Sequence, residues 1–454
     1  MNPSPDAVAS KIADWRSASG PAHRRLSSAL RLAVLDGRIA PGDRLPSERS
    51  LARSIGVSRT TVTTAYRELA DSGFIFTSAR RRPLASLPPS RLRTDPVAPD
   101  ADVIDLSTAS PLAPERHIHA AYSHALDRLP SHLGRTGYDR TGIPELRAAV
   151  ARWFTARGLV TAPDQILITH GAQHALSLVA QSLLSARPRV LVEHPTYPNA
   201  LELFHLLGAR LKATPLLRGR DDLTQWRPLL EEADLVYVVP DFHNPTGTIL
   251  PTWARSALRT SGLLVVDETM VTLGLDGRCL PDTPPVASFH PDAITIGSLS
   301  KSLWAGLRVG WLRAPRQLVA RLARRRAASD LGNSVLDQLA VADLLDAGLS
   351  VDEQTSWQRS ERCDHLRAAL LGSALDVSRI ERPRGGLSLW VQLEEPVAAQ
   401  MAARANLYGL ELSAGPRFSP FGAFQRHLRI PYTLPLDQLD RAIDRLVRLR
   451  SDVK

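Results

Sequence analysis

The sequence predicts two structural units: a short, mostly α-helical unit at the N-terminus and a long unit of the α/β class. Near the N-terminus, Leu26, Leu30 and Val34 recur at helical spacing. Further along, short continuous apolar runs such as Leu235 to Val239 alternate with helical patterns, which is typical of a mostly parallel sheet buried on both faces. The length of 454 residues also favours more than one domain.

The composition is that of a globular chain with a basic surface. Hydrophobic residues make up 44% and charged residues 22% of the chain, which is enough apolar material for a real core. The formal net charge of +10 suggests a polyanionic partner. Two cysteines, Cys279 and Cys363, do not make a disulfide framework. Because there is neither a membrane-length apolar run nor a hydrophobic signal core, we expect a cytoplasmic protein without a membrane partner.

The segment 15–82 carries two short helix patterns joined by a turn. Ser47 can cap a first helix, Gly56 can make the turn, and Ser58 can cap a second helix that buries Tyr66. Two short helices around a glycine-containing turn are typical of the helix-turn-helix motif. The alternative is that these helices form only a structural cap.

In a helix-turn-helix motif, the N-terminal end of the second helix enters the major groove of DNA. Here that end is polar, and Arg59 can donate to guanine edges while the threonine hydroxyls can reach phosphates or bases. A basic run follows the second helix and can lie along the DNA backbone. The predicted DNA-contacting residues are Arg49, Ser58, Arg59, Thr60, Thr61, Thr63, Arg80 and Arg81.

Residues 83–103 have no periodicity and contain several prolines separated by polar residues, which favours a semi-extended linker. We therefore expect a DNA-binding domain over 15–82, a linker over 83–103 and a second domain over 104–454.

Five apolar runs in the second domain are predicted to be strands: 165–169, 190–192, 235–239, 263–266 and 293–296. Ligands of parallel sheets bind beyond the carboxyl ends of the strands, so the residues after each run are the candidates for a site. In chain order these are Gly171-Ala172-Gln173, Tyr197, Asn244, Asp267 and Lys301.

Lys301 is the most informative of these residues. The chain has only four lysines and uses arginine as its cation elsewhere, yet it keeps a lysine immediately after a strand. A buried lysine loses its proton easily and can form an imine, which arginine does not do. The alternative is a surface lysine in a polar loop. Arg308 lies seven residues further on, within reach of the same site.

This ordered set suits pyridoxal 5'-phosphate, which needs a lysine for its aldehyde, an anion site for its phosphate and an acid for its ring nitrogen. Asp267 can serve the ring nitrogen, Asn244 can donate to the phenolate oxygen, and Tyr197 can lie against the ring. A helix start offers free N–H groups to a phosphate. The predicted phosphate residues are Gly171, Ala172, Gln173, Ser298, Ser300 and Arg308.

Both units resemble known families. PGDRLPSERSLARSIGVSRTTVTTAYRELADSGFI resembles the winged-helix DNA-binding domain of the GntR family along its whole length, although the tip of the wing lacks the family's usual glycines. NPTG, VVDE and SLSKSLWAGLRVGW, in this order, resemble the motifs of the fold-type I aminotransferases. The resemblance implies Lys301 as the imine-forming lysine, Tyr138 as a residue that reaches the phosphate of the other subunit, and Arg429 as the anchor of a substrate carboxylate.

Together the two halves resemble the MocR subfamily of GntR regulators. This resemblance implies a homodimer, bound pyridoxal phosphate, operator DNA as a partner and transcription controlled by a small amino compound. Two alternatives stay open: a working aminotransferase with a DNA-binding appendage, and a DNA-binding module whose large domain only dimerises. Thr269 and Met270 stand where aminotransferases often carry a tyrosine that donates to the phenolate, so the sequence leaves enzymatic activity undecided.

Overall fold

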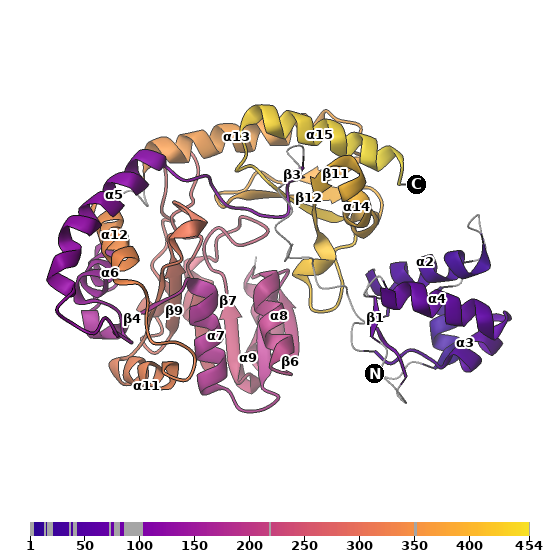
Figure 1. The fold of residues 1–454 in the computed structure, drawn as a ribbon, viewed down its shortest axis with the longest axis horizontal. Helices are drawn as coiled ribbons and strands as arrows, with labels where there is room; N and C mark the ends of the chain where they lie inside the picture. Colours follow the sequence, from indigo (N-terminus) through magenta and orange to yellow (C-terminus); the bar gives the residue numbers. More distant parts are fainter. Residues whose placement is uncertain are drawn as a thin grey trace.

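The structure is a computed structural model of the chain (Figure 1). It describes residues 4–12, 15, 21–35, 38–39, 43–71, 74–76, 82–85, 103–217, 219–348 and 352–453. A small helical unit precedes an α/β unit with one large and one small sheet, as the sequence predicts. None of the helices in these ranges is both long and apolar enough to cross a membrane.

The N-terminal unit is a helical bundle with a short hairpin. Its elements are α1 (Pro5–Lys11), α2 (Ala22–Leu35), α3 (Glu48–Ile55), α4 (Arg59–Asp71), β1 (Ile75–Phe76) and β2 (Leu84–Ala85). The Ser47 hydroxyl accepts a hydrogen bond from the N–H of Ser50 at the start of α3, and Ser58 does the same for Thr61 at the start of α4. Gly56 ends α3 in the left-handed region, at φ 67°, which a glycine adopts without a steric penalty. The predicted caps and turn are therefore confirmed.

The buried faces of these helices are also those that the sequence predicts. Leu26 and Leu30 of α2, Leu51 of α3, and Val62 and Tyr66 of α4 are at most 3% exposed and share one core. β1 and β2 pair antiparallel, as in a wing. The tip between them, with Arg80 and Arg81, lies outside the described residues.

The large sheet is mostly parallel. Its strands are β4 (Ile166–Thr169), β5 (Arg189–His194), β6 (Arg210–Pro215), β7 (Leu235–Val238), β8 (Leu263–Asp267), β9 (Ile294–Ser298) and β10 (Gly310–Arg313), in the spatial order β4-β10-β9-β8-β7-β5-β6. All five predicted runs are strands in this sheet. β10 is antiparallel to both of its neighbours. β5, β7, β8 and β9 pair in parallel, so their carboxyl ends meet at one edge.

Helices cover both faces of this sheet, which explains why its strands read as continuous apolar runs. One face packs against α5 (Glu115–Arg128), α6 (Pro144–Ala156), α9 (Leu223–Glu232), α10 (Thr252–Ala257) and α12 (Val335–Asp346). The other face packs against α7 (Ala172–Leu183), α8 (Pro198–Leu206) and α11 (Arg316–Arg326). Neighbouring strand residues alternate between the two cores: Val236 belongs to the first and Tyr237 to the second.

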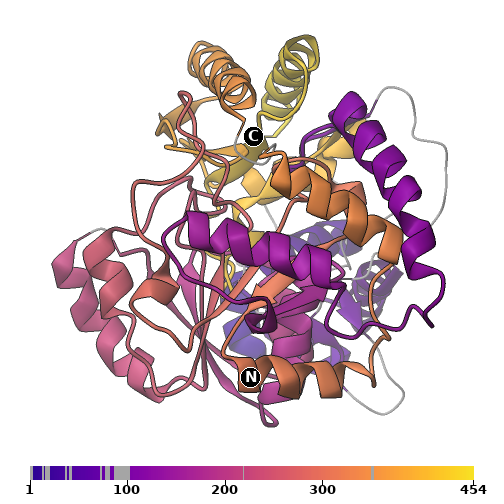
Figure 2. The same ribbon diagram turned by 90° about the vertical axis from the view of Figure 1, so that its left-hand side faces the viewer.

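The small sheet is antiparallel and has the order β11-β12-β15-β14. Its strands are β11 (Val377–Ile380), β12 (Ser388–Leu393), β14 (Ser413–Ala414) and β15 (His427–Pro431). One face is covered by α13 (Glu353–Leu371), α14 (Ala398–Arg404) and α15 (Leu436–Ser451), of which α13 and α15 lie side by side in Figure 2. β3 (Ile104–Asp105) pairs with β13 (Leu410–Glu411) and so ties the start of the domain to this region.

Candidate functional site

Lys301 follows β9 and lies at the carboxyl edge of the large sheet. Its Nζ donates a hydrogen bond to the carbonyl of Ala109, at 2.8 Å. Burial and, to a smaller extent, the positive charge of Arg429 lower the pKa of Lys301 to about 8, although the Asp267 carboxylate opposes both. Lys301 therefore gives up its proton to become the nucleophilic amine far more readily than an ordinary lysine.

Asp267 ends β8 and is held by hydrogen bonds on both carboxylate oxygens. Tyr237 donates from its hydroxyl to Oδ2 at 2.6 Å, and Thr269 donates from its hydroxyl to Oδ1, also at 2.6 Å. Burial raises the pKa of Asp267, and these hydrogen bonds oppose that rise because they favour the ionised form. A cationic ring nitrogen beside this carboxylate would favour ionisation in the same way.

The start of α7 and the Arg308 side chain form a cradle suited to an anion. Gly171 precedes the helix at φ 87°, and a Cβ there would lie 3.3 Å from an Arg308 guanidinium nitrogen. Arg308 itself has a positive φ of 51° and donates to the carbonyl of His170 at 3.0 Å. The free N–H groups of the first helical turn, which includes Ala172 and Gln173, thus lie beside a fixed guanidinium.

Two serines complete this edge. The Ser298 hydroxyl lies 2.8 Å from the Ser300 hydroxyl and donates to the carbonyl of Val309. It also accepts the N–H of Ser300, at 3.1 Å. These contacts fix the turn between β9 and Lys301, so Ser298 shapes the backbone on which Lys301 is presented.

Tyr197 and Asn244 follow β5 and β7. Tyr197 is half-buried at the start of α8, and burial raises its pKa to about 12, so the ring is a neutral phenol. Asn244 has a buried side-chain oxygen without a hydrogen-bond partner among the described residues. A buried polar atom of this kind is costly unless a bound molecule satisfies it.

These observations fit pyridoxal phosphate. The buried lysine of lowered pKa, the hydrogen-bonded carboxylate and the anion cradle are groups that the cofactor needs, and the amide nitrogen of Asn244 can serve as a donor to its phenolate oxygen. Tyr138 stands apart: it is 73% exposed on the loop before α6. In this single chain its hydroxyl faces solvent, so its predicted role depends on a second subunit.

Arg429 lies on β15, which runs between β12 and β14. Its side chain is buried, and a guanidinium nitrogen donates to the carbonyl of Ser107. Burial lowers the pKa of Arg429 to about 10. Its Nε has no partner among the described residues. A buried guanidinium with a free donor is suited to a carboxylate.

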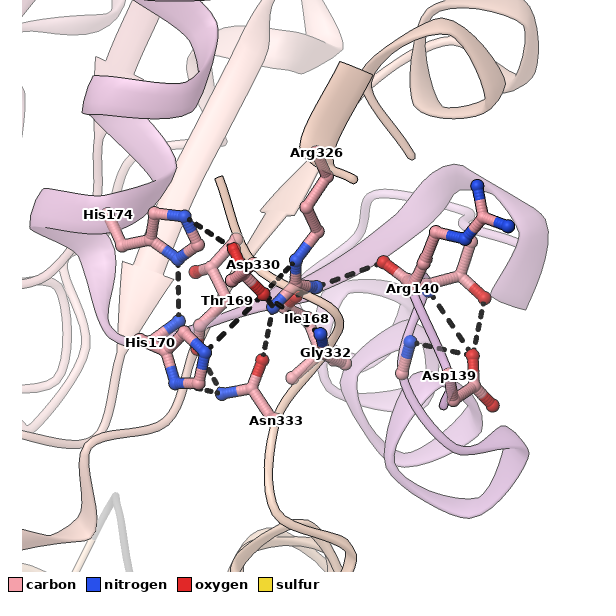
Figure 3. A network of polar contacts seen from close by, with 12 residues as sticks. Asp139, Arg140, Ile168, Thr169, His170, His174, Arg326, Asp330, Gly332 and Asn333 are labelled. Carbon is pink, nitrogen blue, oxygen red and sulfur yellow. Dashed lines mark hydrogen bonds and ion pairs between the residues drawn. The ribbon is translucent and has the colours of Figure 1, made fainter. Parts of the chain in front are cut away.

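A polar network lies behind the anion cradle (Figure 3). The Nε2 atoms of His170 and His174 face Asp330 at 3.5 and 3.2 Å. Arg326 joins the same carboxylate and reaches the carbonyls of Arg140 and Ile168. The network thus connects the loop after Tyr138 with the segment before α7.

Two histidines and an aspartate can hold a metal ion, but the groups behind these rings disfavour it. The N–H of His170 donates to Nδ1 of His174, and the Asn333 amide lies 3.2 Å from Nδ1 of His170, where it can donate. Both Nδ1 atoms then act as acceptors, which leaves the protons on Nε2. A ligating histidine normally donates from its second nitrogen. We therefore interpret the cluster as a hydrogen-bonded support.

Sequence reasoning missed three residues that bear on the site: Tyr237, Ala109 and Ser107. Tyr237 sits inside an apolar strand run and reads as core, and the other two lie in a segment without a motif. The sequence gives Thr269 no role of its own, because it stands where aminotransferases often carry a tyrosine. No local pattern indicates the contacts of Tyr237, Ala109 and Ser107, since each joins segments distant in sequence.

The residues predicted to contact DNA differ in their exposure. Arg49, Ser58, Arg59 and Thr60 are exposed. Thr63 is half-buried, and its hydroxyl donates to Glu48 at 2.8 Å and to the carbonyl of Arg59. The Thr60 and Thr61 hydroxyls each lie 2.8 Å from Ser58. These hydroxyls are already engaged within the motif, which leaves Arg59 and Arg49 as the exposed cations among the predicted DNA contacts that the structure describes.

Comparison with known proteins supports both halves. Residues 23–82 match the gntR family of bacterial regulatory proteins, and residues 101–446 match the aminotransferase class I and II family. The HTH-type transcriptional regulator YisV of Bacillus subtilis is 29% identical over 84% of this chain and 86% of its own length. The probable rhizopine catabolism regulatory protein MocR of Rhizobium meliloti is 28% identical over 73% of each chain.

Among solved structures, the α-aminoadipate aminotransferase LysN of Thermus thermophilus resembles the large unit. That structure holds N-(5'-phosphopyridoxyl)-L-leucine. The TM-score is 0.68 at 27% identity, over 78% of this chain and 93% of that one. With a GntR domain joined to an aminotransferase class I and II domain, and full-length relatives named as HTH-type regulators, this chain belongs to the MocR subfamily of GntR-type transcriptional regulators.

Proposed function

We propose that this chain is a homodimeric regulator that holds pyridoxal phosphate on Lys301 and changes its operator binding when a small amino compound occupies the same pocket. The observation that carries the proposal is the coexistence of an exposed recognition helix and a cofactor pocket built around a lysine of lowered pKa. The domain limits proposed are 15–82, 83–103 and 104–454.

Each pocket residue has a defined task in this proposal. Asp267, held by Tyr237 and Thr269, stays ionised beside the ring nitrogen, while Arg308 and the start of α7 bind the phosphate. Lys301 supplies the neutral amine. When bound, the cofactor supplies an aldehyde that combines reversibly with amines. Arg429, with its free Nε, binds the carboxylate of an amino-acid effector.

The cofactor part is tested by absorbance. The purified protein should show the band of bound pyridoxal phosphate, and Lys301→Ala and Lys301→Arg should both lose it, because arginine keeps the charge without the reactive amine. Lys212→Arg is the matched control. An unchanged band in either Lys301 variant refutes the assignment.

The DNA-binding part is tested with operator and scrambled duplexes. Arg59→Ala should cost about 1–3 kcal/mol on the operator if Arg59 reads a guanine. Arg81→Ala should weaken binding to both duplexes and reduce the dependence on salt. If Arg59→Ala binds the operator as tightly as the parent, the recognition helix is placed wrongly.

A working aminotransferase is the second candidate, and the lowered pKa of Lys301 favours it as much as it favours a sensor. Turnover with amino donors and keto acids, followed by product analysis, separates the two. The dimer is tested by sedimentation. Tyr138 is exposed in the single chain, where its hydroxyl is available to the cofactor phosphate of the other subunit. Tyr138→Phe should therefore weaken cofactor binding without dissociating the dimer.

A further inference from the structure

The small sheet has two chemically different faces. Side chains alternate along a strand, so residues two apart share a face. In β12 and β15, Val391 and Leu428 point into the apolar core under α13 and α15. Trp390, Gln392, His427 and Arg429 take the opposite face, and the register pairs Trp390 with Arg429 and Gln392 with His427. The proposed carboxylate anchor thus shares a face with an aromatic strip.

A cavity of about 330 Å³ lies beside this strip, between the small sheet and the end of β5. Its lining includes Trp390, Phe424, His427 and His194, while Lys301, Asp267 and Arg429 do not line it. The rings support one another: Trp390 stacks on His427 with centroids 4.9 Å apart, and Phe424 lies 4.6 Å from His194. This volume is within the range of small-molecule sites.

The charged side chains that line the cavity are already engaged, which restricts what it can bind. Arg379 pairs with Glu381 across the rim. Asp222 accepts the N–H of Gly219, at 2.9 Å. Burial lowers the pKa of His427 to about 4, so its ring is neutral at pH 7. The Nδ1 of His427 is buried without a hydrogen-bond partner among the described residues. The remaining lining of the cavity is largely aromatic and apolar surface, and the Nδ1 of His427 is its buried ring nitrogen without a partner among the described residues.

We propose that this cavity is a second ligand site, separate from the cofactor pocket, that takes a small, neutral, planar heteroaromatic compound. The compound's ring lies against Trp390 and Phe424, and a polar group on its edge makes the hydrogen bond that His427 lacks. An anion would meet no unpaired cation there, and the two carboxylates of the lining, Glu381 and Asp222, already accept hydrogen bonds.

One ring connects this cavity with Arg429. The Arg429 guanidinium lies 5.6 Å from the centroid of Phe418, and Trp390 packs edge-on against the same ring at 5.3 Å. His194 also holds Ser419, the next residue, at 2.8 Å. A compound that moves the Trp390 side chain therefore also moves the Phe418 ring, against which Arg429 lies. This coupling rests on the proposed role of Arg429, whereas binding in the cavity does not.

The experiment is calorimetric titration of the cofactor-loaded protein with nicotinamide as the probe. Benzoate and N-methylpyridinium serve as charged analogues, and cyclohexanecarboxamide as a non-planar one. We expect saturable binding of nicotinamide, with each of the other three at least about tenfold weaker. Equal affinity for the charged analogues, or no saturable heat with nicotinamide, overturns the proposal.

Variants locate the binding. Trp390→Ala and Phe424→Leu should each weaken nicotinamide at least about tenfold, whereas Trp357→Ala, at an exposed position on α13, should not. Phe424→Leu keeps an apolar side chain, and an unchanged cofactor band in it shows an intact fold. Lys301→Arg should lose the cofactor band yet keep nicotinamide binding. If nicotinamide binding is lost in Lys301→Arg and kept in both cavity variants, the probe binds the cofactor pocket and the proposal is wrong.

Discussion

The Tyr237 hydroxyl donates to Asp267 Oδ2 over 2.6 Å, from the neighbouring strand of the same sheet. Thr269 donates to the other oxygen. Both oxygens of this buried carboxylate therefore accept a hydrogen bond from the protein itself. The acid of the cofactor pocket is therefore positioned by the sheet itself.

Removing this donor should weaken cofactor binding. In Tyr237→Phe, burial acts on Asp267 with one hydrogen bond fewer, so the pKa of Asp267 rises further and the neutral acid becomes more populated. We expect a loss of affinity for pyridoxal phosphate of about 1–1.5 kcal/mol, larger at pH 6 than at pH 8. Absorbance titration of the apoprotein at both pH values measures it. Thr269→Ser, which keeps the hydroxyl, is the control, and equal affinity of Tyr237→Phe and parent would contradict the assigned role.

Cofactor capture should depend on pH with a midpoint near 8. The neutral amine reacts, and it becomes the major form of Lys301 as pH rises through about 8, well below the 10.5 of an ordinary lysine. The rate at which the apoprotein gains the cofactor band should therefore rise between pH 7 and 9 and then level. Stopped-flow absorbance records this profile. A rate that keeps climbing to pH 10 shows that Lys301 has an ordinary pKa.

Glu48 should sharpen DNA recognition through Arg59. Glu48 Oε2 lies 3.3 Å from Arg59 Nε and accepts the Thr63 hydroxyl, so one carboxylate holds the start of α4. In Glu48→Gln, Arg59 loses its ionic partner and the DNA-binding face loses a negative charge. Non-specific binding should strengthen, and the operator-to-scrambled affinity ratio should fall by about 1 kcal/mol. Fluorescence anisotropy at fixed salt measures both affinities, with Glu68→Gln as control. If Glu48→Gln has the same affinity ratio as the parent, Glu48 plays no part in operator recognition.

Arg429→Ala should abolish the response to a carboxylate effector while leaving the cofactor band and basal operator affinity nearly intact. The reason is that Arg429 affects Lys301 only through its charge, whereas the cofactor band depends on the Lys301 amine itself and operator binding depends on the N-terminal unit. Coupling between effector and operator is expected at about 1–3 kcal/mol in the parent. Operator affinity with and without effector measures it, and Arg426→Ala, at an exposed neighbouring position, is the control. A full response in Arg429→Ala means that the carboxylate anchor lies elsewhere.

Much of this architecture is predictable because its signals are local. The five strand runs are continuous and apolar, and Lys301, Asp267 and Asn244 each follow a run directly, so the rule for parallel sheets brings them to one edge. The caps at Ser47 and Ser58 are likewise set within one helical turn.

The parts that the sequence does not predict depend on distant contacts. Tyr237 looks like a core residue, and only the neighbouring strand makes it a donor to Asp267. Thr63 was predicted to face DNA, but Glu48, fifteen residues earlier, binds its hydroxyl. The aromatic cavity brings His194 to Trp390, which lie in different sheets and share no sequence motif.

Alternate residues of β12 and of β15 lie in the apolar core, and the residues between them lie on the opposite face of the small sheet. Leu389 and Val391 hold the fold together, while Trp390 and Gln392, one step along the same strand, face the ligand side. In the proposed effector site, a change of specificity would need substitutions on this face alone, at every second residue of each strand. Substitutions there leave the apolar core intact, so we expect them to cost less stability than substitutions at Leu389 or Val391.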